Sequence, residues 1–439
     1  MAQALLDTGR KAPARCRTGD IVMTGHTERQ KLVVIGNGMA GMDTVEKLLA
    51  IAPDLYDITV FGAEPHGNYN RILLSPLLAG ETALADIMLH PLDWYARHGI
   101  TLHAGRTVTM IDRRNRTVVA ADGTSAPYDR VLLATGSQPI LLPLPGKDLP
   151  GVITYRDIHD VDTMIGAAAR HTSAVVIGGG LLGLEAAYGL MKRGMDVSVV
   201  HLVGTLMERQ LDPVAAAMLR RSLEARGMRF IMPMATQEIL GQDRVTGLRF
   251  ADGSQIAAGL VVMAVGVRPN IGLARKAGLH CERGVVVSDA MQTYDERIYA
   301  VGECVQHRSQ TYGLVAPLFD QAGVCANHLA RRGHISYPGS AVSTRLKVTG
   351  VELFSAGTFS PDAASNDIVL EDAERGVYKR IVLRGNRIVG AVLYGDTADG
   401  AWYFQHLRAG TDMSQRREEL VFGPAFADGG EPAPELAAA

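Results

Sequence analysis

The chain has 439 residues, with 44 lysines and arginines against 46 aspartates and glutamates, and its formal net charge is -2. Because positive charge is not in excess, the composition excludes the usual signature of a nucleic-acid-binding or anionic-membrane-binding protein. Hydrophobic residues make up 47% of the chain, which is enough for a large core, yet no apolar run approaches the roughly 20 residues that cross a bilayer. We therefore predict no nucleic-acid partner and no membrane partner.

The four cysteines are Cys16, Cys281, Cys304 and Cys325. They form no C-x-x-C pair and do not repeat at metal-ligand spacing, so we expect no metal site. Unpaired thiols are typical of the reducing cytosol, which predicts a cytoplasmic location.

Both ends of the chain have the composition of tails. Residues 1–29 carry basic side chains without the apolar stretch of a signal peptide, and Met23 is an alternative start. Residues 424–439 are rich in alanine, glycine and proline. We predict that both segments are disordered.

The first predicted element is a strand at residues 32–35, followed by the glycine-rich turn "GNGMAG". A helix is predicted for residues 42–52 and a second strand for 57–64. Strand, turn, helix and strand in this order form a βαβ unit of a parallel sheet.

The turn of this unit fits the pattern G-x-G-x-x-G through Gly36, Gly38 and Gly41. In this pattern the first glycine permits a tight turn, the second lets the backbone approach a pyrophosphate, and the third lets the helix pack on the strand. The amides at the start of the helix then face the phosphates. Glu64 follows Gly41 by 23 residues and is placed to accept hydrogen bonds from a ribose. We predict a dinucleotide site whose contacts also include the turn residues Met39 and Ala40.

The same unit recurs 142 positions later. A strand is predicted for residues 174–177, a helix for 181–193 and a strand for 196–201. The second turn repeats the glycine pattern, and the contacts predicted there are Gly178, Gly180, Leu182 and Gly183. Two such sites imply two dinucleotides. FAD with NAD(P)H is the simplest pair, because NAD(P)H donates a hydride and FAD accepts and stores it.

The second unit lacks an acid where the partner of a ribose 2′-hydroxyl is expected, because its last strand ends in Val200, His201 and Leu202. His201 could bind a hydroxyl or could cap the strand. Arg209 could attract a 2′-phosphate, but it lies beyond the expected position. The sequence thus leaves the choice between NADH and NADPH open, with a slight preference for NADH.

Alternating β-type sequence fills the rest of the chain. An "ADG" turn at 121–123 predicts a hairpin, and residues 248–270 repeat the strand, turn and strand pattern. After about residue 340 the pattern changes to a predicted hairpin with Gly385 and Asn386 at its turn, followed by a helix around Trp402.

Three further segments carry a family resemblance. "LLATGSQP" at 132–139, "MAVGVRPN" at 263–270 and "TYDERIYAVGEC" at 293–304 resemble the crossover and flavin motifs of the FAD/NAD-linked pyridine nucleotide-disulfide oxidoreductase superfamily. The resemblance covers roughly residues 31–420. Longer segments, among them "FGAEPHGNYNRILLSPLL" and "HLVGTLMERQLD", are similar to one branch: the flavoprotein portion of the NAD(P)H nitrite reductase large subunit and the electron-transfer subunit of assimilatory nitrate reductase.

The resemblance implies an α/β fold with two Rossmann-like three-layer domains and a C-terminal α+β domain. The FAD-binding domain would be split into residues 30–148 and 269–338. The NAD(P)-binding domain would occupy residues 149–268, and the C-terminal domain residues 339–423, which could mediate pairing into a homodimer.

The resemblance also implies roles for individual residues. Arg71 is expected at the flavin edge, or alternatively on an FAD phosphate or a surface carboxylate. Glu185 is expected beside the stacked nicotinamide and flavin, with pairing to Arg71 or a helix-starting role as alternatives. Glu303 stands where the family has an aspartate that binds the flavin ribityl chain. Other contacts with the cofactors are expected from Asn70, Ala134, Thr135, Gly136, Gly266, Gly302 and Pro317.

Where thiol-using members of the superfamily carry redox cysteines, this chain has Leu74, Ser75 and Pro76. A thiol mechanism needs a nucleophilic sulfur beside the flavin, so disulfide reduction is disfavoured. We expect hydride transfer from nicotinamide C4 to flavin N5, with catalysis mainly by positioning of the rings. Electrons would then pass singly to a separate iron–sulfur, sirohaem or molybdenum reductase partner. The alternatives are a rubredoxin or ferredoxin reductase, a water-forming NADH oxidase, and an FAD-binding redox sensor without turnover.

Overall fold

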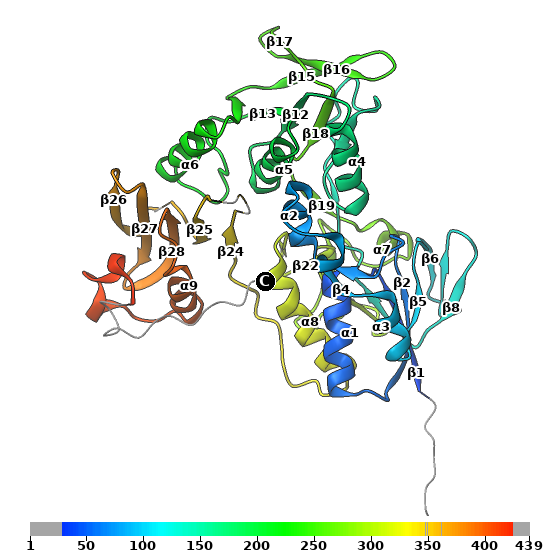
Figure 1. Ribbon diagram of the computed structural model, residues 1–439. Coiled ribbons are helices and arrows are strands. Elements are labelled where there is room, and N and C mark those ends of the chain that lie inside the picture. Colours follow the sequence, from blue (N-terminus) through cyan, green and yellow to red (C-terminus); the bar gives the residue numbers. More distant parts are fainter. Residues whose placement is uncertain (1–28, 347, 349, 361, 425–439) are drawn as a thin grey trace, which may run out of the picture.

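The computed structural model describes residues 29–346, 348, 350–360 and 362–424 (Figure 1). The two predicted tails lie outside the described residues, except for their inner ends at Arg29 and Pro424, and so do Cys16 and Met23.

The first domain is built on a five-stranded sheet whose neighbouring strands are all parallel. The central strand β1 (Gln30–Ile35) is buried from Leu32 onward, which explains why it reads as the continuous apolar run Leu32–Ile35 rather than as an alternation. In spatial order the strands are β21 (Ile298–Ala300), β9 (Arg130–Leu133), β1 (Gln30–Ile35), β2 (Tyr56–Phe61) and β5 (Thr101–His103). Because β21 comes from the far end of the sequence, this domain is assembled from two separate segments of the chain.

Helices α1 (Met39–Ile51) and α8 (Val315–Leu329) lie side by side in this domain (Figure 1). Side chains of an antiparallel sheet join the same core, and that sheet consists of β6 (Val108–Asp112), β7 (Thr117–Ala120) and β8 (Ser125–Pro127). The hairpin predicted at the "ADG" turn is confirmed between β7 and β8.

The second domain repeats this plan with another five-stranded parallel sheet. Its strands are β11 (Val152–Thr154), β18 (Leu260–Met263), β12 (Ser173–Ile177), β13 (Asp196–Val200) and β14 (Arg229–Ile231). Its helices are α4 (Ile158–Ala168), α5 (Leu181–Lys192) and α6 (Pro213–Ala225). An antiparallel sheet adds β15 (Thr236–Gly241), β16 (Val245–Phe250) and β17 (Gln255–Ala257). The predicted strands and helix of the second βαβ unit are confirmed to within one residue at each end.

The chain crosses between the two domains twice. These crossings, β10 (Ser137–Pro139) and β19 (Val267–Pro269), pair as an antiparallel ribbon. Helix α2 (Leu74–Ala79) of the first domain packs directly on α5 of the second, because a Cβ added at Gly189 would lie 2.6 Å from the Leu78 side chain. The two dinucleotide units are therefore in direct contact.

Short elements connect these parts. The strands are β3 (Asn68–Tyr69), β4 (Met88–His90), β20 (Val285–Val287), β22 (Val305–His307) and β23 (Gln310–Thr311), and the helices are α3 (Leu92–Arg97) and α7 (Gly272–Lys276). Single 3₁₀ turns occur at Arg71–Leu73, Leu84–Ile87, Ser414–Arg416 and Leu420–Phe422.

The C-terminal domain is an antiparallel five-stranded sheet with α9 (Gly400–Ala409) packed on it. In spatial order its strands are β24 (Ser343–Arg345), β25 (Leu353–Gly357), β28 (Arg387–Tyr394), β27 (Val377–Arg384) and β26 (Asn366–Asp372). The hairpin predicted at Gly385 and Asn386 joins β27 to β28. Trp402 and Tyr403 are buried in the core of this domain, as expected.

This domain docks on α6 of the second Rossmann-like domain (Figure 1). The contact centres on Asp212, which is fully buried and caps α6 by accepting from the amides of Val214 and Ala215. The same carboxylate accepts a hydrogen bond of 3.2 Å from the Tyr378 hydroxyl and lies 3.8 Å from the Arg380 guanidinium. Burial, with the charge of Asp212, raises the pKa of Tyr378 to about 12.

Asp212→Ala is expected to lower the free energy of unfolding by roughly 2–4 kcal/mol, since it removes a helix cap and the partner of buried polar groups. Asp212→Asn is the matched control, because asparagine caps a helix equally well. Urea unfolding can be followed by Trp402 fluorescence in a Trp94→Phe background, which silences the other tryptophan. Equal midpoints for Asp212→Ala and the unsubstituted chain would contradict the docking role.

Candidate functional site

The two glycine turns have the same backbone geometry. Gly36 and Gly178 adopt φ values of 114° and 122°, which L side chains rarely adopt. A Cβ on either residue would collide with the carbonyl oxygen of Ala134 or Ala264, at the end of the neighbouring strand. Only glycine therefore allows the chain to turn from strand to helix at these two points.

The third glycine of each turn is required by helix packing. A Cβ on Gly41 would lie 2.9 Å from the Gly36 carbonyl oxygen, and a Cβ on Gly183 would collide with the Gly178 carbonyl oxygen. Each helix thus lies directly against its own turn.

The second glycine of each turn is different, because the fold itself does not require it. Gly38 and Gly180 are the N-caps of α1 and α5 in ordinary extended conformations, and a Cβ on either would meet nothing within 4 Å. The open space lies at the start of a helix, where backbone amides attract phosphate. Both turns therefore fit the pyrophosphate of a dinucleotide.

The other predicted contacts of the glycine turns lie nearby. Met39 and Ala40 are buried in the first turn of α1, and Leu182 is half-buried in the first turn of α5. Thr135 follows β9 and donates from its hydroxyl to the Asn270 carbonyl at 2.9 Å. Gly136 and Gly266, at the two crossings, have φ values of 64° and 107°.

Glu64 and Arg71 form an ion pair with each other. Glu64 lies three residues beyond the end of β2, and it also accepts a hydrogen bond of 2.7 Å from the Tyr69 hydroxyl. Arg71 donates to the Arg156 carbonyl at 2.9 Å, and its guanidinium lies 5.0 Å from the centre of the Tyr69 ring. Arg71 was expected at the flavin edge, on an FAD phosphate or on a carboxylate. The structure shows a carboxylate contact, with Glu64. Asn70 uses its side-chain oxygen to accept from the Ile72 amide.

Glu185 contacts Ser75 rather than Arg71. Its carboxylate accepts a hydrogen bond of 2.6 Å from the Ser75 hydroxyl, which also accepts one of 3.2 Å from the Tyr155 hydroxyl. Glu185 and Ser75 are buried, and burial raises the pKa of Tyr155. This contact joins α2 to α5.

Glu303 forms an ion pair with Arg156 and accepts a hydrogen bond of 2.9 Å from the Ser137 hydroxyl. Its neighbour Gly302 has a φ of 91°, and a Cβ there would lie 3.1 Å from the Cβ of Ala40. The second segment of the first domain therefore meets the first glycine turn. Pro317 is buried in the first turn of α8.

Sequence reasoning missed Arg156. Its guanidinium binds Glu303, its carbonyl accepts from Arg71, and its amide donates to the Asp160 carboxylate at 2.6 Å. Burial raises the pKa of Asp160 to about 6. Arg156 belongs to no motif and lies 147 positions from Glu303, so nothing in the sequence pattern could have identified it.

Two of the thiols lie in the core, and the sulfur of Cys304 contacts the Leu133 and Val301 carbonyl oxygens. Cys304 and Cys325 are fully buried, and burial raises the pKa of both. Within the described ranges, no group of three or more His, Cys, Asp or Glu side chains is arranged to hold a metal ion. No helix in the same ranges has the length and apolar character of a membrane span.

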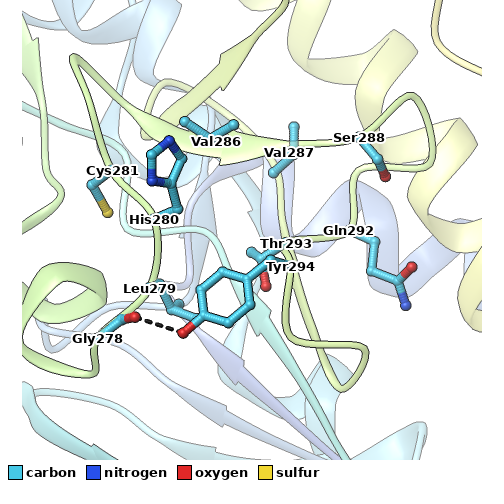
Figure 2. Close-up of a pocket in the computed structure, with 10 residues that line it drawn as sticks. All are labelled: Gly278, Leu279, His280, Cys281, Val286, Val287, Ser288, Gln292, Thr293 and Tyr294. Carbon is cyan, nitrogen blue, oxygen red and sulfur yellow. Dashed lines mark hydrogen bonds between the residues drawn. The ribbon is translucent and has the colours of Figure 1, made fainter.

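A surface pocket of about 830 Å³ lies between Gly278 and Tyr294 (Figure 2). The Tyr294 hydroxyl donates to the Gly278 carbonyl at its rim, and burial raises the pKa of the half-buried Cys281 thiol. Its lining residues include none of either glycine turn, so it is separate from the candidate site.

Family models and relatives agree with this geometry. Residues 30–317 match the pyridine nucleotide-disulphide oxidoreductase family. The chain belongs to this family. Residues 343–411 match the rubredoxin NAD+ reductase C-terminal domain. The predicted superfamily and fold class are thus confirmed. Membership of this family, together with the free space at the second glycine of each turn, supports FAD and NAD(P)H as the cofactors.

Two relatives from Bacillus subtilis (strain 168) are similar over most of the chain. The nitrite reductase [NAD(P)H] is 50% identical over 402 residues, which are 92% of this chain and 50% of the relative. The assimilatory nitrate reductase electron transfer subunit is 43% identical over 91% of this chain and 52% of its own length. The chain therefore spans about half the length of these relatives. Among solved structures, the covalent putidaredoxin reductase–putidaredoxin complex matches with a TM-score of 0.79 and 26% identity, covering 87% of this chain and 94% of that one.

Proposed function

We propose that this chain is a cytoplasmic flavoprotein that passes electrons from NAD(P)H through FAD to a separate reductase partner in nitrite or nitrate reduction. FAD would bind at the turn of Gly36, Gly38 and Gly41, and NAD(P)H at the turn of Gly178, Gly180 and Gly183. The partner would carry an iron–sulfur, sirohaem or molybdenum centre, as the similarity to the two Bacillus subtilis proteins supports.

One observation carries this proposal: the hydrogen bond between Ser75 and Glu185 joins the two dinucleotide units where a redox thiol would otherwise stand. Bound FAD supplies a carrier that takes two electrons as hydride from a nicotinamide and gives them up to an external acceptor. The residues of this chain hold the two dinucleotide units in place through the α2–α5 contact. They also exclude thiol chemistry at this point, because the buried Ser75 has no nucleophilic sulfur.

The charged residues near the first turn have a positioning role in this proposal. Arg71 is held by Glu64 and by the Arg156 carbonyl, and Arg156 is held by Glu303. These contacts link both segments of the FAD domain to the start of the NAD(P) domain. A cation held this way is oriented before the cofactor arrives, so no reorganisation accompanies the reaction.

Anaerobic addition of NADH to the FAD-loaded protein is expected to bleach the flavin absorbance near 450 nm, and ferricyanide is expected to restore it with steady-state turnover. Thiol alkylation should leave the rate unchanged, because Cys304 and Cys325 are fully buried and the half-buried Cys281 lines a pocket that shares no residue with either glycine turn. A flavin that NADH cannot bleach would instead support a redox sensor without turnover.

A second candidate is a rubredoxin or ferredoxin reductase, which the match of residues 343–411 favours. Both candidates predict the same reaction with ferricyanide, so the acceptor decides between them. Rapid electron transfer to added rubredoxin or ferredoxin, with none to a sirohaem-containing partner, would replace the first proposal by the second.

A further inference from the structure

The loop after β13 folds back onto the second glycine turn. Its anchor is the buried pair Leu206 and Met207, and the Met207 amide donates to the Gly179 carbonyl at 3.0 Å. A Cβ added at Gly179 would lie 2.8 Å from the Leu206 side chain. The residue that follows this anchor, Glu208, is thereby held beside the turn although it lies eight positions past the strand end.

His201 fixes the Glu208 carboxylate in this place. The Gly179 amide donates to His201 Nδ1 at 3.1 Å, so this nitrogen bears a lone pair and the ring proton is on Nε2. Nε2 then donates to the Thr205 carbonyl at 3.1 Å and to Glu208 Oε2 at 3.2 Å. His201 therefore acts as a structural link between the glycine turn and the loop, which agrees with a capping role at the strand end.

The Glu208 side chain keeps 41% of its surface exposed, so its other oxygen is accessible. In a dinucleotide fold an acidic side chain near the end of the second strand accepts from the ribose 2′-hydroxyl, and a carboxylate there repels a 2′-phosphate. Leu202 and Val203 of the same loop are exposed, at 67% and 40%, and offer an apolar surface to an adenine ring.

We infer that Glu208, positioned by His201 against the second glycine turn, makes this site selective for NADH over NADPH. The inference rests on the proposed function, in which the second turn binds the nicotinamide coenzyme. It supplies the acid that the sequence lacks at the strand end, where Val200, His201 and Leu202 stand. Arg209, exposed and next in the chain, is the competing determinant, since it would favour a 2′-phosphate.

The test is the affinity of the FAD-loaded protein for NAD⁺ and for NADP⁺, measured by isothermal titration calorimetry. The unsubstituted protein should bind NAD⁺ at least about tenfold more tightly than NADP⁺, because one charge-assisted hydrogen bond contributes about that much affinity. Glu208→Gln should lower this ratio by roughly tenfold, and Glu208→Arg should reverse the preference. Glu224→Gln is the matched control, because Glu224 is equally exposed at 40%, is paired with Arg220 on α6, and lies outside this loop.

Because binding needs no turnover, the outcomes separate the inference from the proposed function. Equal affinity for both coenzymes, or equal weakening of both by Glu208→Gln, would overturn the inference and leave the proposed function standing. A ratio that falls only in Arg209→Gln would also overturn it. A protein that binds neither coenzyme would end both proposals.

Discussion

Replacing Gly38 by valine is expected to give a folded protein that retains no FAD. A Cβ at this position meets no protein atom within 4 Å, and the backbone is extended, with φ -87° and ψ 178°, which valine adopts readily. The side chain would instead fill the space that the pyrophosphate needs at the start of α1. Losing two amide-to-phosphate hydrogen bonds costs roughly 3–6 kcal/mol, or more than about 100-fold in affinity.

The ratio of flavin to protein absorbance after reconstitution measures this effect, and circular dichroism verifies the fold. Gly272→Val is the matched control, since a Cβ there also meets nothing within 4 Å but lies away from both glycine turns. Gly36→Val is the opposite control and should fail to fold, because its Cβ would collide with the Ala134 carbonyl. A yellow, fully loaded Gly38→Val protein would contradict the assignment of the first turn.

The parts of the fold that could be predicted from the sequence are those fixed by local pattern. The apolar runs of β1 and β12 and the glycine spacing after them predict strand, turn and helix in both units. The second unit matches to within one residue, whereas in the first the helix begins three residues earlier than predicted, at Met39, and the second strand ends three residues earlier, at Phe61. The hairpin at Gly385 and Asn386 was predictable for the same reason, because two residues of turn type set the register of both strands.

The pairings of charged residues could not be predicted, because sequence spacing carries no information about them. Glu303 meets Arg156, and Glu185 meets Ser75, across distances of more than 100 positions. Glu208 is linked to the glycine turn through His201, in a loop whose Leu206 and Met207 are buried, and this link also could not be predicted. The assignment of Glu64 to a ribose remains a prediction, since its carboxylate here binds Arg71 and Tyr69.

Replacing Gly180 by valine is expected to have the complementary effect: the protein keeps FAD, but NADH reduces it far more slowly. Gly180 repeats the geometry of Gly38 at the second turn, with φ -83° and ψ -179° and no atom within 4 Å of an added Cβ. The variant should therefore fold and bind FAD at the first turn, while the coenzyme is displaced from the start of α5.

Stopped-flow bleaching by NADH should slow by on the order of 100-fold, because small displacements of a bound reactant are costly. Dithionite, which needs no binding site, should still bleach the flavin. Together, the two variants assign one cofactor to each turn. Gly38→Val should lose the absorbance of bound FAD, whereas Gly180→Val should keep this absorbance and lose only its rapid reduction by NADH. If Gly180→Val lost FAD, or if NADH reduced it at the normal rate, the assignment of one cofactor to each turn would be wrong.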